Sequence, residues 1–296
     1  MLKFTIFLIL LTITSLKANA AGPEYRDFLV ERQPMPAGLL LKQDLASTKT
    51  DVTLDNNKTR DLTMYHKKTW LDASPILMTN NPKSFTALGV GYMGDQFDSL
   101  QTNAISNHYS GVYASLYAIS EINPHWYWNA YLSYGLFSEK NVNASANSKK
   151  TFSFATLAYK RNSRQVYKLG IMHNSNFGQD VLLPTLGLSY SRGSYVLDAL
   201  LPSYLSLRKI HTQKLHSIVK AEFSYASYYD HNQKDILAIS GIDTGVVVEY
   251  NIYPLVWLHI GGSYASEKQL TWLKSDDDFA TIKSGYKLDS GINVRF

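Results

Sequence analysis

The segment "HNSNFGQD", residues 173–180, contains the residue types of a hydrolytic site. His173 and Ser175 lie two positions apart, so their side chains point to the same face if the segment is an extended strand. A histidine next to a serine can remove the hydroxyl proton, and Asp180 is near enough in sequence to orient the imidazole. These three residues are the candidate catalytic group, and their chemistry would be the hydrolysis of an acyl ester.

A simpler interpretation competes with this one. The tetrapeptide His173-Asn174-Ser175-Asn176 resembles the His-x-Ser-Asn sequence of two outer-membrane lipid hydrolases, phospholipase A and the lipid A deacylase. Those enzymes continue with a small residue, whereas Phe177 follows here, and the neighbouring strands offer no carboxylate on the same face. A polar rim on a passive structure is therefore the favoured interpretation, and no catalytic residue is assigned.

The elements that would position these residues alternate between apolar and polar side chains from about residue 84 onward. In "WYWNAYLSYGLF", residues 126–137, every second residue from Trp126 is apolar, which is the pattern of a half-buried strand. The pattern predicts twelve strands: 84–92, 107–119, 126–137, 151–160, 165–173, 182–191, 194–201, 203–209, 214–229, 242–252, 255–265 and 282–296.

Three features favour a membrane barrel over a soluble sandwich. The segments are about ten residues long, their apolar faces are rich in tyrosine and tryptophan, and short and long connections alternate along the chain. Lipid offers no partner to unpaired backbone groups, so the sheet must close on itself. We therefore predict an all-β protein, a transmembrane antiparallel up-and-down β-barrel of about 12 strands, with a range of 10–14. At Pro202 either a very tight outer turn joins two strands, or one long strand bends at a bulge.

The two ends of the chain have different expected roles. Residues 1–20 combine Lys3, an apolar run and a small-x-small site ending at Ala20, which is typical of a cleaved signal peptide. Residues 21–83 form an N-terminal lead that holds two extra strands, a lumen plug or a periplasmic segment, and residues 84–296 form the barrel. The last strand is expected to carry an assembly signal, formed by Leu288, Ile292, Val294 and Phe296.

Composition excludes several kinds of site. The chain has no cysteine, which rules out disulfides and thiolate metal sites. Its formal net charge of +5 falls to +3 without Lys3 and Lys17, and no basic cluster points to nucleic acid. We expect no cofactor and no metal. The expected partners are outer-membrane lipids and, through the C-terminal strand, the barrel-assembly machinery of a Gram-negative bacterium.

The polar faces of the strands predict the lining of the lumen. Its charges have mixed signs, so they can pair and close the lumen or line a narrow polar pore. The predicted inward residues are Asn129, Lys220, Glu222, Glu249, Asn251, His259, Lys287, Asp289, Asn293 and Arg295.

The stretch "FGQDVLLPTLGLSYSRGSYVLDALLP" resembles the core of an uncharacterised outer-membrane barrel family, domain of unknown function 6268. The residues that carry the resemblance are Phe177-Gly178, Leu183-Pro184, Gly187-Leu188 and Leu201-Pro202. The resemblance implies a barrel without an assigned activity, and it implies no catalytic residue.

The sequence thus leaves three functions open. The first is a porin-like or structural barrel that passes small solutes at most. The second is an outer-leaflet lipid hydrolase that uses His173 and Ser175, and the third is an adhesion barrel that works through its outer loops. The sequence leaves the solute and the oligomeric state open.

Overall fold

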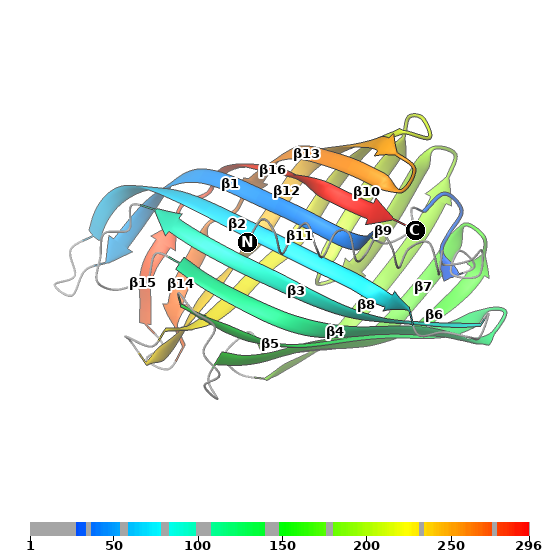
Figure 1. Cartoon of the computed structure of the whole chain (residues 1–296), viewed down its shortest axis with the longest axis horizontal. Coiled ribbons are helices and arrows are strands. Elements are labelled where there is room, and N and C mark those ends of the chain that lie inside the picture. The colour runs from blue at the N-terminus through cyan, green and yellow to red at the C-terminus, as the bar shows by residue number, and fades with distance from the viewer. Residues whose placement is uncertain are drawn as a thin grey trace.

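The computed structural model describes residues 28–33, 37–53, 59–77, 83–98, 108–139, 148–175, 180–230, 234–273 and 277–295. Within these ranges, sixteen strand segments form one sheet (Figure 1). They are β1 Ala37–Thr53, β2 Thr59–Leu77, β3 Ser84–Asp98, β4 His108–Asn123, β5 Trp126–Glu139, β6 Lys149–Asn162, β7 Gln165–Asn174, β8 Val181–Arg192, β9 Tyr195–Leu201, β10 Tyr204–Ile210, β11 Leu215–Asp230, β12 Asp235–Tyr253, β13 Val256–Ala265, β14 Lys268–Trp272, β15 Asp277–Ile282 and β16 Gly285–Arg295.

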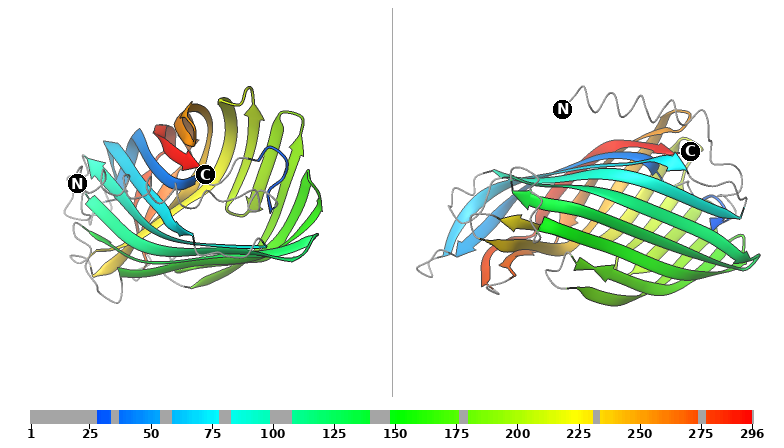
Figure 2. Two further views of the ribbon diagram at one scale, coloured as in Figure 1. Left: turned by 45° about the vertical axis from the view of Figure 1, so that its right-hand side comes forward. Right: turned by 60° about the horizontal axis from the view of Figure 1, so that its bottom comes forward.

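The sheet closes into a barrel because its first and last strands pair. β1 pairs with β16 from Ala37 opposite Arg295 to Ala46 opposite Lys287, and consecutive strands pair antiparallel around the ring. β14 continues β13 along the edge of β12, and β15 continues β16 along the edge of β1. The described segments therefore make a closed barrel of 14 strands, and the views of Figure 2 show the strands surrounding an interior.

All twelve segments predicted from alternation are strands of this barrel, and the predicted range of strand number is confirmed. The two strands beyond the best estimate are β1 and β2, which lie in the lead before residue 84. At Pro202 the chain makes a tight turn between β9 and β10, which pair from Leu200 opposite Tyr204. The bent single strand is therefore not formed.

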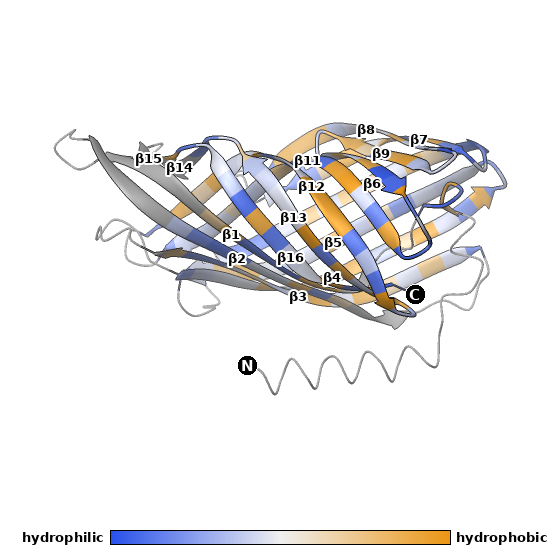
Figure 3. Ribbon diagram, turned by 90° about the horizontal axis from the view of Figure 1, so that it is seen from above, coloured by the Kyte–Doolittle hydropathy of each residue, from blue (hydrophilic) through white to orange (hydrophobic). Residues whose placement is uncertain are grey.

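Alternation along the strands separates an apolar outer face from a polar inner face. On β7 and β8 the outward Leu169 and Leu186 are 60% and 61% exposed, whereas the inward Thr185 is fully buried. Figure 3 shows this alternation as orange and blue residues along single strands. The outward face is the surface that lipid would cover, because it carries exposed large apolar side chains on successive strands.

The two ends of the barrel differ in their connections. The turns between β4 and β5, β6 and β7, β8 and β9, and β12 and β13 are short, and we call this the inner end; the opposite end is the outer end. Three parts of the sequence-based predictions lie outside the described ranges: the expected signal peptide at residues 1–20, the segment Asn176 to Gly178, and the final aromatic residue Phe296. Among the described residues, no helix is long and apolar enough to cross a bilayer.

Candidate functional site

The three residues proposed for hydrolysis come together only in part. His173 Nε2 lies 3.2 Å from Asp180 Oδ1, so the loop carboxylate does reach the imidazole. The Ser175 hydroxyl is used elsewhere: it donates to the backbone carbonyl of Thr151 at 3.0 Å and accepts from the Thr151 N–H at 2.6 Å. Within the described part of the chain, no hydrogen bond joins His173 to Ser175.

This geometry gives the serine a structural role. The hydroxyl donates its hydrogen bond to the Thr151 carbonyl and so ties the end of β7 to the start of β6, and among the described residues no base accepts from it. The Asp180 side chain is 78% exposed, which makes its contact with His173 a solvated pair at the outer rim.

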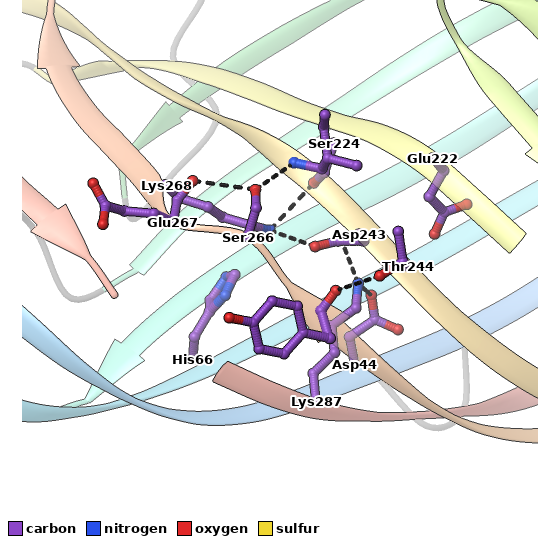
Figure 4. Close-up of polar contacts among 12 residues, drawn as sticks. Asp44, His66, Glu222, Ser224, Asp243, Thr244, Ser266, Glu267, Lys268 and Lys287 are labelled. Atoms are coloured by element: carbon purple, nitrogen blue, oxygen red, sulfur yellow. Dashed lines mark hydrogen bonds and ion pairs between the residues drawn. The ribbon is translucent and has the colours of Figure 1, made fainter. Parts of the chain in front are cut away.

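Charged side chains cover the inner face of β11 to β16 and β1, which we call the charged wall. Lys287 Nζ lies 2.6 Å from Asp243 Oδ2 and 3.3 Å from Asp44 Oδ2, and Lys268 Nζ lies 3.3 Å from Asp243 Oδ1 (Figure 4). The β11 residue Lys220 lies 3.0 Å from Glu222 and 3.5 Å from Asp289. Two of these pairs, Lys287–Asp44 and Lys220–Asp289, join strands that are far apart in sequence.

A second group of charges lies nearer the inner end. Glu249 on β12 accepts hydrogen bonds from the guanidinium groups of Arg208 on β10 and Arg295 on β16, the latter at 2.5 Å. Arg295 also lies 5.0 Å above the Trp257 ring, and His216 stands 4.6 Å from that ring. The buried Glu249 carboxylate therefore pairs with two guanidinium groups from two other strands.

The other residues predicted for the lumen take mixed places. Asn129, His259 and Asn293 are buried on the inner face, at 9%, 8% and 7% exposure. Asn251 instead closes the β12–β13 turn, because its Nδ2 donates to the carbonyls of Tyr253 and Val256. On β16, Leu288 and Ile292 face outward, whereas Val294 is buried.

Residues 28–33, which precede β1, lie inside the inner end of the barrel. In the left view of Figure 2 this short blue segment lies within the ring, beside the green strands. Val30 is fully buried, and with Phe28 it packs among Ile119, Tyr127, Ala158, Val166 and Val196. Glu31 N donates to Ser163 O and Arg32 Nη1 donates to Gly193 O, so the segment is tied to two inner turns. We call it the N-terminal plug.

The outer end is also packed with apolar side chains. Phe97, Tyr109, Phe137, Ala226, Tyr228, Leu237, Ile239, Leu270 and Ile282 form one buried cluster. It forms because β11 crosses the barrel: Tyr229 pairs with Ser138 at the end of β5, and Tyr109 OH donates to Asp230 at 2.8 Å. Both ends of the lumen are therefore filled by described side chains.

A cavity of about 720 Å³ lies beside this crossing. We call it the aromatic chamber and define it by Tyr113, Tyr131, Phe152, Phe154, Phe223 and Tyr225. Tyr131 stacks on Phe154 with ring centroids 5.7 Å apart, and it contacts Phe152 at 5.8 Å. A concave, mainly apolar cavity of this size is suited to a small organic molecule.

The chamber reaches the outside of the barrel above the β9–β10 hairpin. β9 and β10 have seven residues each, and at about 3.3 Å per residue and a tilt of about 40° they cover about 18 Å of a membrane band of about 25 Å. Past this hairpin, the described part of β11 pairs on the β10 side only at Tyr229, opposite Ser138 of β5, and its outward Phe223 is 43% exposed while it lines the chamber. We call this gap in the wall the notch.

The sequence did not identify the chamber. The signal was present, because Phe152 and Phe154 alternate on β6 and Tyr131 lies on the polar face of β5. The polar lumen that the sequence predicts is lined by charged and amide side chains, and its predicted lining omits Asp44 and Asp243 of the charged wall as well as Arg208, which contacts Glu249.

Comparisons with known proteins add the following. No protein-family model matches the chain, and no curated protein sequence matches it. Among solved structures, an outer membrane channel from Pseudomonas putida F1 is similar at 8% identity and a TM-score of 0.49, covering 89% of this chain and 98% of that one. A FadL homologue from Pseudomonas aeruginosa is similar at 9% identity and a TM-score of 0.41, covering 87% and 90%. LpxR from Salmonella typhimurium is similar at 8% identity and a TM-score of 0.36, covering 78% and 88%.

Proposed function

We propose that this chain is a porin-like barrel of the outer membrane that passes small, partly apolar solutes passively through the aromatic chamber. The observation that carries the proposal is the chamber itself, a cavity of about 720 Å³ that reaches the outer surface at the notch. Its size and aromatic lining suit a small organic molecule better than an ion.

The filled lumen argues against a wide aqueous pore. The apolar cluster occupies the outer end, and Phe28 and Val30 of the N-terminal plug occupy the inner end. The charged wall is held by its own ion pairs, so its charges are already neutralised within the protein. A solute that leaves the chamber toward the inner end must displace the plug, which is held by the packing of Phe28 and Val30, by hydrogen bonds and by the ion pair of Glu31 with Arg164.

Two assays on the purified, full-length mature protein test the proposal. In planar bilayers, the filled lumen predicts no large, long-lived conductance steps. In proteoliposomes, phenyl glucoside, which bears an apolar ring and crosses bilayers poorly, should enter faster than a disaccharide of similar size. Large conductance steps together with equal rates for the two solutes would identify an open polar pore and reject the proposal.

The export route and the family are inferred from the sequence pattern. We infer that residues 1–20 direct export and that the assembly machinery of a Gram-negative cell inserts the barrel through its C-terminal strand. The outward positions of Leu288 and Ile292 support this inference. Membership in domain of unknown function 6268 rests on the Leu-Pro and Gly-Leu pairs of β8 and on Leu201-Pro202, which forms part of the β9–β10 hairpin.

A further inference from the structure

Lys150, at the start of β6, is a buried cation in the aromatic chamber. It is 5% exposed, and it is the one charged side chain among the described residues that line the cavity. No ion pair or side-chain hydrogen bond is formed by its ammonium group with any residue that the structure describes. The other inward lysines with this degree of burial, Lys268 and Lys287, each contact a carboxylate.

The strand register explains why Lys150 points into the chamber. On β6 the exposed Lys149 precedes it and the chamber residue Phe152 follows two positions later, so Lys150 and Phe152 share the inner face. Its partner across the pair with β5 is Gly135, which offers no side chain to neutralise it. A Cβ at Gly135 would lie 2.6 Å from the carbonyl oxygen of Val112, so no larger residue fits that position without a backbone shift.

The acid that contacts the chamber residue Tyr113 is already engaged. Asp72 on β2 accepts a hydrogen bond from the hydroxyl of Tyr113 at 2.6 Å, and Trp70 Nε1 donates to the same hydroxyl at 2.7 Å. These three residues form a closed polar chain at the chamber wall.

Burial of an ammonium group without a counter-charge is unfavourable, and an anion that enters with an apolar body removes that cost. We propose that the aromatic chamber binds a small amphipathic carboxylate, with its apolar body among Tyr131, Phe152 and Phe154 and its carboxylate on Lys150 Nζ. This inference rests on the proposed function and narrows its solute class. Two sources share this chemistry, a soluble aromatic acid and a fatty acid that arrives from the outer leaflet.

The test is isothermal titration calorimetry on the full-length mature protein in detergent, with 4-phenylbutyrate, its neutral amide and decanoate as probes. A charge-assisted hydrogen bond in this mainly apolar cavity should make 4-phenylbutyrate bind about tenfold to a hundredfold more tightly than the amide. Lys150→Met should remove this difference, whereas Lys149→Met, at the exposed neighbour, should leave it unchanged. Decanoate that binds more tightly than 4-phenylbutyrate would indicate a lipid source, and the reverse order a soluble acid.

Lys150→Arg keeps the positive charge, so it distinguishes loss of the charge from a folding defect in Lys150→Met. It should restore most of the preference for the carboxylate, and the heat-dependent gel mobility of each variant reports whether the barrel is intact. Equal binding of 4-phenylbutyrate and its amide to the wild type, or an unchanged preference in an intact Lys150→Met barrel, would overturn the inference. Phenyl glucoside uptake would still be observed in that case. Carboxylate binding without any solute uptake would instead reject the proposed function and leave the binding site standing.

Discussion

Replacement of Glu249 by glutamine tests whether the inner charges hold the barrel wall together. The Glu249 side chain is 5% exposed, and its carboxylate is shared by Arg208 and Arg295, whose side chains are 13% and 10% exposed. Glu249→Gln removes the one carboxylate that pairs with both guanidinium groups among the described residues. Removal of one partner from a buried ion pair costs about 3–5 kcal/mol, and we expect a loss in this range in the free energy of unfolding.

The measurement is urea-induced unfolding in lipid vesicles, followed by tryptophan fluorescence. Arg208→Gln should cost less than Glu249→Gln, because the carboxylate keeps Arg295 at 2.5 Å. Glu121→Gln is the matched control: its partner Lys83 is 65% exposed at a distance of 3.3 Å, so a change of about 0–1 kcal/mol is expected. If Glu249→Gln is as stable as Glu121→Gln, the inner charges do not stabilise the wall and the reasoning is refuted.

Two further predictions concern the outer rim and the N-terminal plug. Ser175→Ala removes two hydrogen bonds to the Thr151 backbone, so the free energy of unfolding should fall by about 1 kcal/mol. Fatty-acid release from phospholipid vesicles should stay as in the wild type. A release activity that Ser175→Ala abolishes would reinstate the hydrolase. Val30→Asp places a carboxylate at a fully buried apolar position, so trypsin should cleave the plug faster at Arg32. The control Glu31→Asp changes an exposed side chain and should leave the cleavage rate nearly unchanged. Equal cleavage rates for the two variants would show that the plug is not packed in solution.

The fold could be predicted to the extent that each strand carries its own pattern. On β5, alternation from Trp126 to Leu136 gave the strand, its faces and its approximate ends. β1 was harder, because Leu39, Leu40 and Leu41 are consecutive and mask the alternation of the following Lys42 and Asp44. Closure itself depends on β1 meeting β16, a pairing between the two ends of the chain that no local pattern specifies.

The site could be predicted less well, because its contacts depend on the register of distant strands. Lys287 was expected in the lumen, but its contact with Asp44 spans 243 positions and exists only once the barrel has closed. The chamber depends on two short strands, β9 and β10, that free β11 to cross toward β5. The alternation predicts where β9 and β10 lie, but it does not predict that their shortness lets β11 cross toward β5.

The most direct test of the central claim, that solutes pass through the aromatic chamber, is the uptake rate of phenyl glucoside in proteoliposomes. Ser133 lines the chamber from β5, and Ser133→Trp would fill part of the cavity of about 720 Å³. Ala130→Trp adds the same ring on the opposite face of the same strand, toward lipid. We predict that Ser133→Trp reduces uptake severalfold and that Ala130→Trp leaves it unchanged. Equal uptake by both variants and the wild type would contradict the account.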